Sequence, residues 1–212
     1  MKHPNLESKL RKEWFERMGK TPVSKKIIEE IINSYNEEHR HYHDLRHVNM
    51  CIEEIKKLGL EKEIGKKNFL KLYVTLLVHD LVYNPKSNVL SSASYGKNIS
   101  SGLGFGKAFA KDVYYGVIVT DHSTPPKNRL EMIAADADLA ILGKEKTAVD
   151  QYDDGIRVEY SLIPIEIYRK RRKGILSLFL NRKNIYYTLE FRQLYESKAR
   201  ENLRRIIEER LS

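Results

Sequence analysis

The sequence predicts an all-α protein built as a single helical-bundle domain. Three observations support this fold class. Apolar residues recur with the period of an α-helix along nearly the whole chain, capping residues and glycines separate the periodic stretches, and no internal repeat or low-complexity tract divides the chain. With 212 residues and 41% hydrophobic content, the chain is long enough to bury one full core.

The first two helices are recognised by their ends. Gly19 follows a stretch with an apolar residue at every fourth position, so the first helix is expected to end there. Thr21 and Pro22 are the residue types preferred at the N-cap and at the first position of the second helix. The apolar stripes of the two helices are Leu6, Leu10, Trp14 and Met18, and then Val23, Ile27, Ile28, Ile31, Ile32 and Tyr35.

The remaining helices follow from the same period. They are expected at about 44–58, in the segment that ends at 78, and at about 129–142, 147–160, 164–180 and 189–211. The Ser- and Gly-rich segment 87–106 is predicted to be a loop around a short helix. The segment DVYYGVIVT at 112–120 fits a strand and a buried helix equally well.

The net charge of +9, from 38 basic and 29 acidic residues, favours anionic partners such as nucleotides, phosphates or nucleic acid. The densest basic cluster, 169–173, fits either a solvated helix face or a patch that contacts phosphate or nucleic acid. The single cysteine, Cys51, rules out an internal disulfide and fits a reducing cytosol. Without a signal-peptide segment or an apolar run long enough for a bilayer, we expect a cytoplasmic protein with no membrane partner.

Histidines and aspartates gather where apolar helices are expected to meet. The stretch LLVHDLVYN at 76–84 ends an apolar run with a histidine beside an aspartate, and a carboxylate removed from water needs a partner. Two further histidines lie four residues apart and share a helix face. The segment AADADLAILG adds two aspartates. In chain order these residues are His43, His47, His79, Asp80, Asp136 and Asp138.

A divalent metal ion would satisfy this set. It would take neutral imidazoles from His47 and His79 and pair with the carboxylates of Asp80 and Asp138. Such a shell suits Mn, Fe, Zn, Co or Ni, and Mg where oxygen ligands dominate. Helical bundles build these sites from ligands that point inward. Taken singly, each residue also has a structural interpretation, as a hydrogen-bonded core histidine, a surface histidine, or a helix-capping or ion-paired aspartate.

The motifs resemble a known family. The order His, His-Asp, Asp resembles the HD-domain superfamily of metal-dependent phosphohydrolases, whose members are all-helical. The stretch YHDLRHV at 42–48 resembles the YHNxxHA motif of cyclic-nucleotide phosphodiesterases, which belong to the same superfamily. The resemblance implies that His47 is a metal ligand, that His43 protonates the leaving oxygen, and that Asp138 rather than Asp136 is the last ligand.

A second resemblance covers most of the chain. The segments LVHDLVYNP, TDH, DADLAILG, IRVEY, RRKGILSLFL and ARENL resemble, in this order, a bacterial-type group of predicted HD phosphohydrolases. We therefore expect one HD-type phosphohydrolase domain, an HD-domain-like helical bundle, over 1–212. It would consist of N-terminal helices at 1–40 and a motif-bearing core at about 42–203.

Two departures from that group bear on activity. After VYNP the group usually carries Asp-Asn-Glu, whereas this sequence has Ser87, Asn88 and Val89. If the missing acids hold or activate the attacking water, the protein is slow, altered in substrate or inactive. Asp44 replaces the usual Asn of the YHN motif, and an acidic neighbour would keep His43 protonated, as a general acid requires.

The expected function is that of an HD-type metal-dependent phosphohydrolase, a phosphomonoesterase or phosphodiesterase. Its substrate would be a nucleotide or a related phosphorylated small molecule, cleaved by a metal-bound hydroxide. His43 and Asp80 would be the catalytic residues. The alternative is a catalytically decayed HD-fold protein that binds nucleotide or nucleic acid through its basic surface, with nucleic acid the less favoured partner.

Three further residues are candidates for substrate binding. His122 fits either a second metal or a non-bridging phosphate oxygen, and the two options stand equal. Arg157 and Arg172 are weaker candidates for phosphate recognition. For Arg157, an i,i+4 ion pair with Asp153 is the favoured structural alternative.

Overall fold

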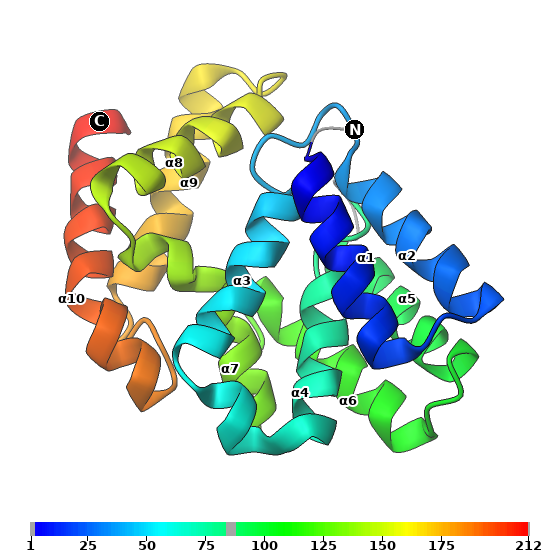
Figure 1. The fold of residues 1–212 in the computed structure, drawn as a ribbon. Coiled ribbons are helices and arrows are strands. Elements are labelled where there is room, and N and C mark those ends of the chain that lie inside the picture. Colours follow the sequence, from blue (N-terminus) through cyan, green and yellow to red (C-terminus); the bar gives the residue numbers. More distant parts are fainter. Residues whose placement is uncertain (1–2, 84–87, 212) are drawn as a thin grey trace. The chain divides into compact units, whose positions relative to one another are not determined.

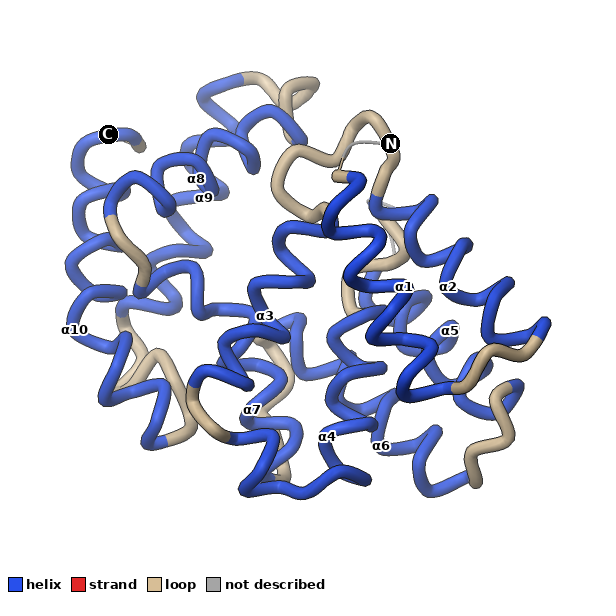
Figure 2. The backbone as a smooth tube through the Cα atoms, in the orientation of Figure 1, coloured by secondary structure: helices blue, strands red, loops and turns tan. Residues whose placement is uncertain are grey.

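The structure, a computed structural model, describes residues 3–83 and 88–211. These residues form ten α-helices, two short 3-10 helices and one short π-helix, with no strand among them (Figure 1, Figure 2). The predicted all-α class is confirmed. None of the described helices has both the length and the apolar character needed to cross a lipid bilayer. In chain order the elements are α1 (Pro4–Met18), α2 (Pro22–Tyr35), α3 (Leu45–Lys57), α4 (Leu60–Val78), α5 (Asn88–Gly102), α6 (Lys107–Ile118), η1 (Val119–Asp121), α7 (Arg129–Asp138), η2 (Leu139–Gly143), α8 (Lys146–Glu159), α9 (Ile165–Leu180), α10 (Leu189–Arg205) and η3 (Ile206–Arg210).

The chain divides into two compact units. The first unit, residues 1–135, holds α1 to α6, η1 and the start of α7. The second unit, residues 136–212, holds the end of α7 and all later elements. The single domain expected over the whole chain stays a prediction.

The helices α1 and α2 form a pair at the start of the first unit, and their ends are those that the sequence predicts. Gly19 follows α1 with a φ of 72°, a left-handed conformation that glycine adopts without a Cβ penalty. Oγ1 of Thr21 accepts a hydrogen bond from the N–H of Ser24 at 3.1 Å and caps α2. The fully buried Trp14 donates its Nε1–H to Oγ of Ser24 at 2.8 Å, which joins the two helices.

The helix α4 lies at the centre of the first unit. It packs against α3, α5 and α6, and every residue from 72 to 79 is buried. A helix that is buried on all sides belongs to a core. A break at Gly65, with φ 78° and ψ 161°, separates this part from the more exposed first turns. The buried part leads directly to His79 and Asp80.

The prediction of a loop around a short helix at 87–106 is wrong for most of that segment, because α5 is 15 residues long. Its small residues allow it to approach α4 closely. A Cβ at Gly96 would lie only 2.9 Å from Cγ2 of Val78, and Ser92 is fully buried. Glycine and serine are weak helix formers, so close packing overrides the local propensity here.

The segment 112–120, which fits a strand and a helix equally well by sequence, is helical. It forms the end of α6 and the short helix η1. Gly116 faces α4 so closely that a Cβ there would lie 2.8 Å from Oγ1 of Thr75. Val113 and Val117 are fully buried, which explains the apolar, β-branched character of the segment.

The helix α10 organises the second unit, where it packs against η2, η3 and α9. Nδ2 of Asn202, the asparagine of ARENL, donates to the carbonyl oxygens of Leu142 and Lys144, both at 2.9 Å. At the other end of α10, Oδ2 of the buried Asp136 accepts from the N–H and the hydroxyl of Thr188, both at 2.7 Å. These bonds hold α10 to the end of α7 and to the segment that follows it.

Candidate metal centre

Three side chains from two helix ends converge in the first unit. His47 lies in the first turn of α3, and His79 and Asp80 follow the last residue of α4. Nε2 of His47 lies 3.0 Å from Nε2 of His79. Oδ2 of Asp80 lies 3.0 Å from Nε2 of His79 and 3.5 Å from Nε2 of His47. The structure thus brings together three of the four residues that the sequence predicts as metal ligands.

The three atoms are spaced like the ligands of one divalent ion. Bonds of about 2.1 Å at angles of roughly 90° to 110° place neighbouring ligand atoms about 3.0–3.4 Å apart. The observed separations of 3.0, 3.0 and 3.5 Å lie in or next to this range. Two histidines and one carboxylate on one side of an ion are also a recurrent ligand set, which leaves positions open for other ligands.

The hydrogen bond of His79 explains why a cation fits between these atoms. Nδ1 of His79 lies 2.9 Å from the carbonyl oxygen of Leu76, which can only accept, so Nδ1 carries the proton. In the neutral ring Nε2 then holds a lone pair, which faces the carboxylate oxygen of Asp80 at 3.0 Å. Two acceptors at this distance repel each other unless a proton or a cation lies between them. The bond to Leu76 also fixes the orientation of the ring, as is usual for a histidine that binds metal.

Asp80 is the acid of this group, and its side chain is 23% exposed. Burial by itself raises the pKa of the carboxyl group. When they are protonated, the neighbouring imidazoles of His79, His43 and His47 outweigh that effect and hold the pKa of Asp80 well below its usual value. Asp80 is therefore ionised at neutral pH, as a metal ligand must be.

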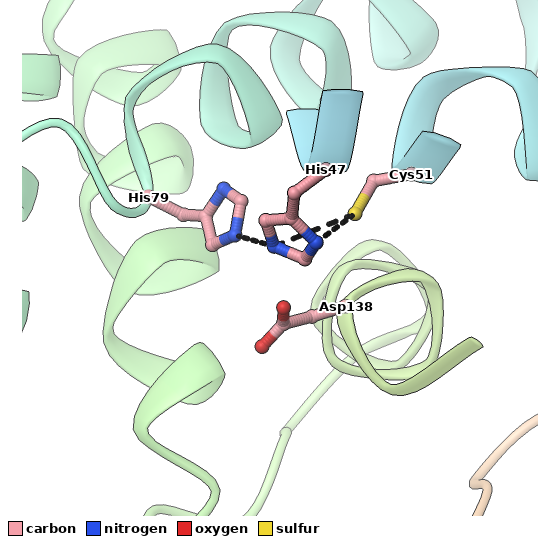
Figure 3. A group of neighbouring side chains, drawn as sticks. All are labelled: His47, Cys51, His79 and Asp138. Atoms are coloured by element: carbon pink, nitrogen blue, oxygen red, sulfur yellow. Dashed lines mark hydrogen bonds between the residues drawn. The ribbon is translucent and has the colours of Figure 1, made fainter. Parts of the chain in front are cut away.

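Cys51 lies one helical turn after His47 on α3 and is fully buried. Its Sγ lies 3.9 Å from Nε2 of His47. One ligand atom each from His47, Cys51 and His79 lie within 4.8 Å of one another, so these buried side chains form a group that could hold a metal ion (Figure 3). The sequence interpretation used Cys51 only as a redox marker. The spacing His-x3-Cys on one helix face was the signal that could have found it.

His43 lies at the edge of the group, just before α3. Its Nε2 is 4.0 Å from Oδ2 of Asp80, and its side chain is 23% exposed. Asp44, expected to act on His43, has another role. It is the N-cap of α3, and its carboxylate lies 2.7 Å from Nη2 of Arg46 and 3.2 Å from Nε2 of His3. Asp80 is thus an acid that faces His43.

Arg40 joins the loop before α3 to the end of α4. Its Nη1 donates to the carbonyl oxygens of His43 at 3.0 Å and Asp80 at 2.8 Å, and its Nη2 donates to that of Leu81 at 2.7 Å. The side chain is 1% exposed and pairs with Glu37 at 2.9 Å. Arg40 thus fixes the distance between the two segments that carry the ligands. Sequence analysis missed it, although an arginine inside a run of histidines was a visible signal.

Asp138, the fourth predicted ligand, is the last residue of α7 and belongs to the second unit. Its side chain is half-buried and is drawn in Figure 3. The other aspartate of the same segment, Asp136, is fully buried and bonded to Thr188. That structural engagement agrees with the choice of Asp138 over Asp136, and Asp138 stays the predicted ligand.

Arg157 and Arg172, the candidates for phosphate recognition, lie on α8 and α9 in the second unit. Nε of the buried Arg172 donates to Oδ1 of Asp153 at 3.3 Å. Arg157 does not form the i,i+4 ion pair with Asp153 that was the favoured structural alternative. Its Nη1 donates instead to the carbonyl oxygens of Tyr160 and Ile163, at 2.8 and 3.2 Å. A phosphate contact of either arginine stays a prediction.

His122 follows η1 and has a φ of 58°, the one positive φ of a non-glycine residue in the described ranges. Such a conformation costs roughly 1–2 kcal/mol and is often found at functional sites. The carboxylate of Asp121 supports the turn, since it accepts from the N–H groups of Ser123 and Thr124 at 2.8 and 2.9 Å. The role predicted for His122 is compatible with this strain and stays a prediction.

Two further sequence features, the positions that depart from the family pattern and the basic cluster, can be located in the structure. Of the positions that depart from the family pattern, Ser87 lies outside the described residues, and Val89 is half-buried in the first turn of α5. The basic cluster 169–173 is not a uniform patch, because Arg172 is buried. The exposed residues of the cluster are Lys170, Arg171 and Lys173, and Arg169 is half-buried.

Comparison with known proteins supplies no relative. The chain matches no protein-family model, no curated protein and no solved structure. The observations that bear on function are therefore the geometry of the metal group and the motifs of the sequence.

Proposed function

We propose that this protein is a metal-dependent phosphohydrolase of the HD type, which cleaves a phosphoester of a nucleotide or a related phosphorylated small molecule. One observation carries the proposal. Nε2 of His47, Nε2 of His79 and Oδ2 of Asp80 form a triangle with sides of 3.0, 3.0 and 3.5 Å. The chain order of these residues is also the order on which the resemblance to HD phosphohydrolases rests.

His47, His79 and Asp80 would hold a divalent ion, and Asp138 is proposed as a further ligand on the basis of the sequence. The ion would act as a Lewis acid that activates water and stabilises negative charge on phosphoryl oxygens. Mn, Fe, Co, Ni and Zn suit the ligand set. The thiol of Cys51, 3.9 Å from Nε2 of His47, favours the softer of these ions over Mg.

His43 is proposed as the general acid. Its partly exposed ring lies at the edge of the group, with Nε2 4.0 Å from Oδ2 of Asp80. A protonated ring in this place can reach the leaving oxygen of a substrate that approaches from solvent, an effect worth roughly two to four powers of ten in rate. His122, Arg157 and Arg172 are proposed as contacts for the phosphate group.

The test combines metal content with turnover. Elemental analysis of the purified protein should find roughly one or two equivalents of a transition metal. Phosphomonoesters, cyclic nucleotides and nucleoside phosphates should then be screened with Mn, Mg, Co and Ni. His43→Ala should keep the metal and lose roughly 100-fold or more in turnover. His79→Ala should lose both. The exposed His41 of the same loop offers a matched control, and His41→Ala should keep both.

Two outcomes would contradict the proposal in different ways. A protein loaded with metal that turns over no member of the panel would contradict the enzymatic activity, and would favour the alternative of a decayed HD-fold protein. A wild-type protein that binds none of these metals would contradict the metal centre itself.

A further inference from the structure

The helices α5 and α6 pack against each other in the first unit (Figure 1). Side chains of the two helices line a groove of about 540 Å³. The side chains that matter here are Lys97 and Ser101 from α5, and Lys107, Lys111, Tyr114 and Tyr115 from α6. We call this the α5–α6 groove. None of the proposed metal ligands lines it. Its volume falls within the range of small-ligand sites, and it would hold roughly one or two nucleotides.

The groove carries an uncompensated positive charge. Lys97, Lys107 and Lys111 are exposed, and none of them pairs with a carboxylate within the part of the chain that the structure describes. The one acidic residue between positions 88 and 118 is Asp112, and it lies 2.7 Å from Nζ of Lys71. Lys107 and Lys111 are one turn apart, about 6 Å along α6. Three lysines that face one groove without acids favour a ligand with several negative charges.

The same groove offers aromatic rings beside the lysines. Tyr115 is 42% exposed, so part of its ring is open to a ligand from solvent. Tyr114 packs edge-on against it, with ring centroids 5.4 Å apart and an interplanar angle of 87°. Nζ of Lys111 lies 5.9 Å from the Tyr115 centroid. The exposed ring is thus held in place by one neighbour and lies next to a positive charge.

We propose that the α5–α6 groove binds a short segment of single-stranded nucleic acid. Lysines along a groove contact backbone phosphates, and exposed aromatic rings stack on bases, which is the usual combination in proteins that bind single strands. Duplex nucleic acid is disfavoured, because its bases are already stacked and the ring of Tyr115 would find no partner. Neither the metal centre nor hydrolysis enters this proposal, which stands on the groove alone.

The experiment measures the binding of a fluorescent ten-nucleotide single strand by anisotropy, in EDTA, so that its result is independent of the metal centre. Three phosphate contacts on a single strand give a slope of about −2 for log K against log salt. Affinity should therefore fall roughly 20-fold between 50 and 200 mM salt. Lys97→Gln, Lys107→Gln and Lys111→Gln together should weaken binding at least about tenfold at 50 mM salt. These are surface changes, and thermal unfolding should be measured to check that the variant is folded.

Matched variants separate the groove from net charge in general. Lys170→Gln, Arg171→Gln and Lys173→Gln change the formal charge equally on another exposed surface, and should leave affinity within about twofold of wild type. Tyr115→Ala should weaken binding about fivefold or more, whereas Tyr115→Phe, which keeps the ring, should bind like wild type. The single strand should bind better than a duplex of the same length.

Three results would overturn the proposal. The first is no binding of the single strand at 50 mM salt. The second is a loss with the 170, 171 and 173 substitutions that equals or exceeds the loss with the groove substitutions. The third is a loss with the groove lysines but none with Tyr115→Ala, which would mean that the groove attracts any polyanion rather than a strand with bases.

Discussion

Asp80 in the first unit and Asp153 in the second both lie among charged or ionisable side chains. The two aspartates differ in whether these neighbours are permanent cations. Asp153 is 4% exposed and faces permanent cations, Nε of Arg172 at 3.3 Å and Nη1 of Arg210 at 3.3 Å. Asp80 faces the imidazoles of His79, His47 and His43, of which His79 is nearest at 3.0 Å. An arginine is always charged, whereas a neutral histidine can present a lone pair.

The difference shows how a structural site can be told from a site built for an ion. The charge of Asp153 is balanced by the guanidinium groups of Arg172 and Arg210 without an added ion. The group around Asp80 brings two imidazole nitrogens and a carboxylate oxygen within 3.5 Å of one another, and His79 is held in the tautomer that points a lone pair inward. In the first arrangement the loss of one partner leaves a buried charge unpaired, whereas the second arrangement needs a proton or a cation between the Asp80 carboxylate and the His79 lone pair.

The largest expected effect is on stability at Asp153. Asp153→Ala leaves the buried guanidinium of Arg172 without its partner, so the free energy of unfolding should fall by about 3–5 kcal/mol while metal content stays unchanged. Chemical denaturation and elemental analysis measure the two quantities. The adjacent, exposed Asp154 is the control, and Asp154→Ala should cost at most about 1 kcal/mol. Loss of metal in Asp153→Ala would contradict the distinction between a structural Asp153 and a metal-binding Asp80.

At Asp80 the opposite pattern is expected. Asp80→Asn removes a ligand, so metal affinity should fall by about 100-fold or more, as measured by titration of the metal-free protein. In EDTA at pH 8, the free energy of unfolding should not fall, because the amide removes the repulsion between carboxylate and lone pair. If Asp80→Asn destabilises the metal-free protein by more than about 2 kcal/mol, Asp80 has a structural role like that of Asp153.

Arg40 should affect the centre through position rather than contact. Arg40→Met removes the bonds to the carbonyl oxygens of His43 and Asp80, so metal affinity should fall roughly 10- to 100-fold even where the protein remains folded. Arg46 lies in the same segment with a side chain that is 59% exposed, and Arg46→Met should bind metal like wild type. Equal affinities in the two variants would show that Arg40 does not set the ligand spacing.

The smallest effect is expected at Cys51. Cys51→Ser should weaken Zn and Co binding about tenfold and leave Mn binding nearly unchanged, because the thiolate prefers the softer ions. In the Co-loaded protein the wild type should show a near-ultraviolet thiolate-to-cobalt absorption that the variant lacks. Identical spectra would mean that Cys51 is only packed beside His47.

The parts of the fold that the sequence predicts are those with local signals. Thr21, Pro22 and Gly19 mark helix ends by their own backbone preferences, and the structure has those ends. The helix α5 has no such signal, because its small residues serve contacts with α4 that are invisible in the segment itself. Glycine is needed at position 96, and at position 116 of α6, because a Cβ there would lie too close to Val78 or Thr75.

The candidate site divides in the same way. The order of histidines and aspartates led to His47, His79 and Asp80 because ligand chemistry restricts residue type. Arg40 escaped notice because its bonds go to backbone oxygens, one of them 40 residues away, and any residue can supply a backbone oxygen. A contact between a side chain and a distant main chain cannot be predicted from the sequence of the segment that supplies the main-chain atoms.

The most direct test of the metal centre is a crystal grown with manganese and measured for anomalous scattering. We expect one peak about 2.1–2.3 Å from Nε2 of His47, Nε2 of His79 and Oδ2 of Asp80. A map without a peak between these atoms, in a crystal that holds manganese elsewhere, would contradict this expectation.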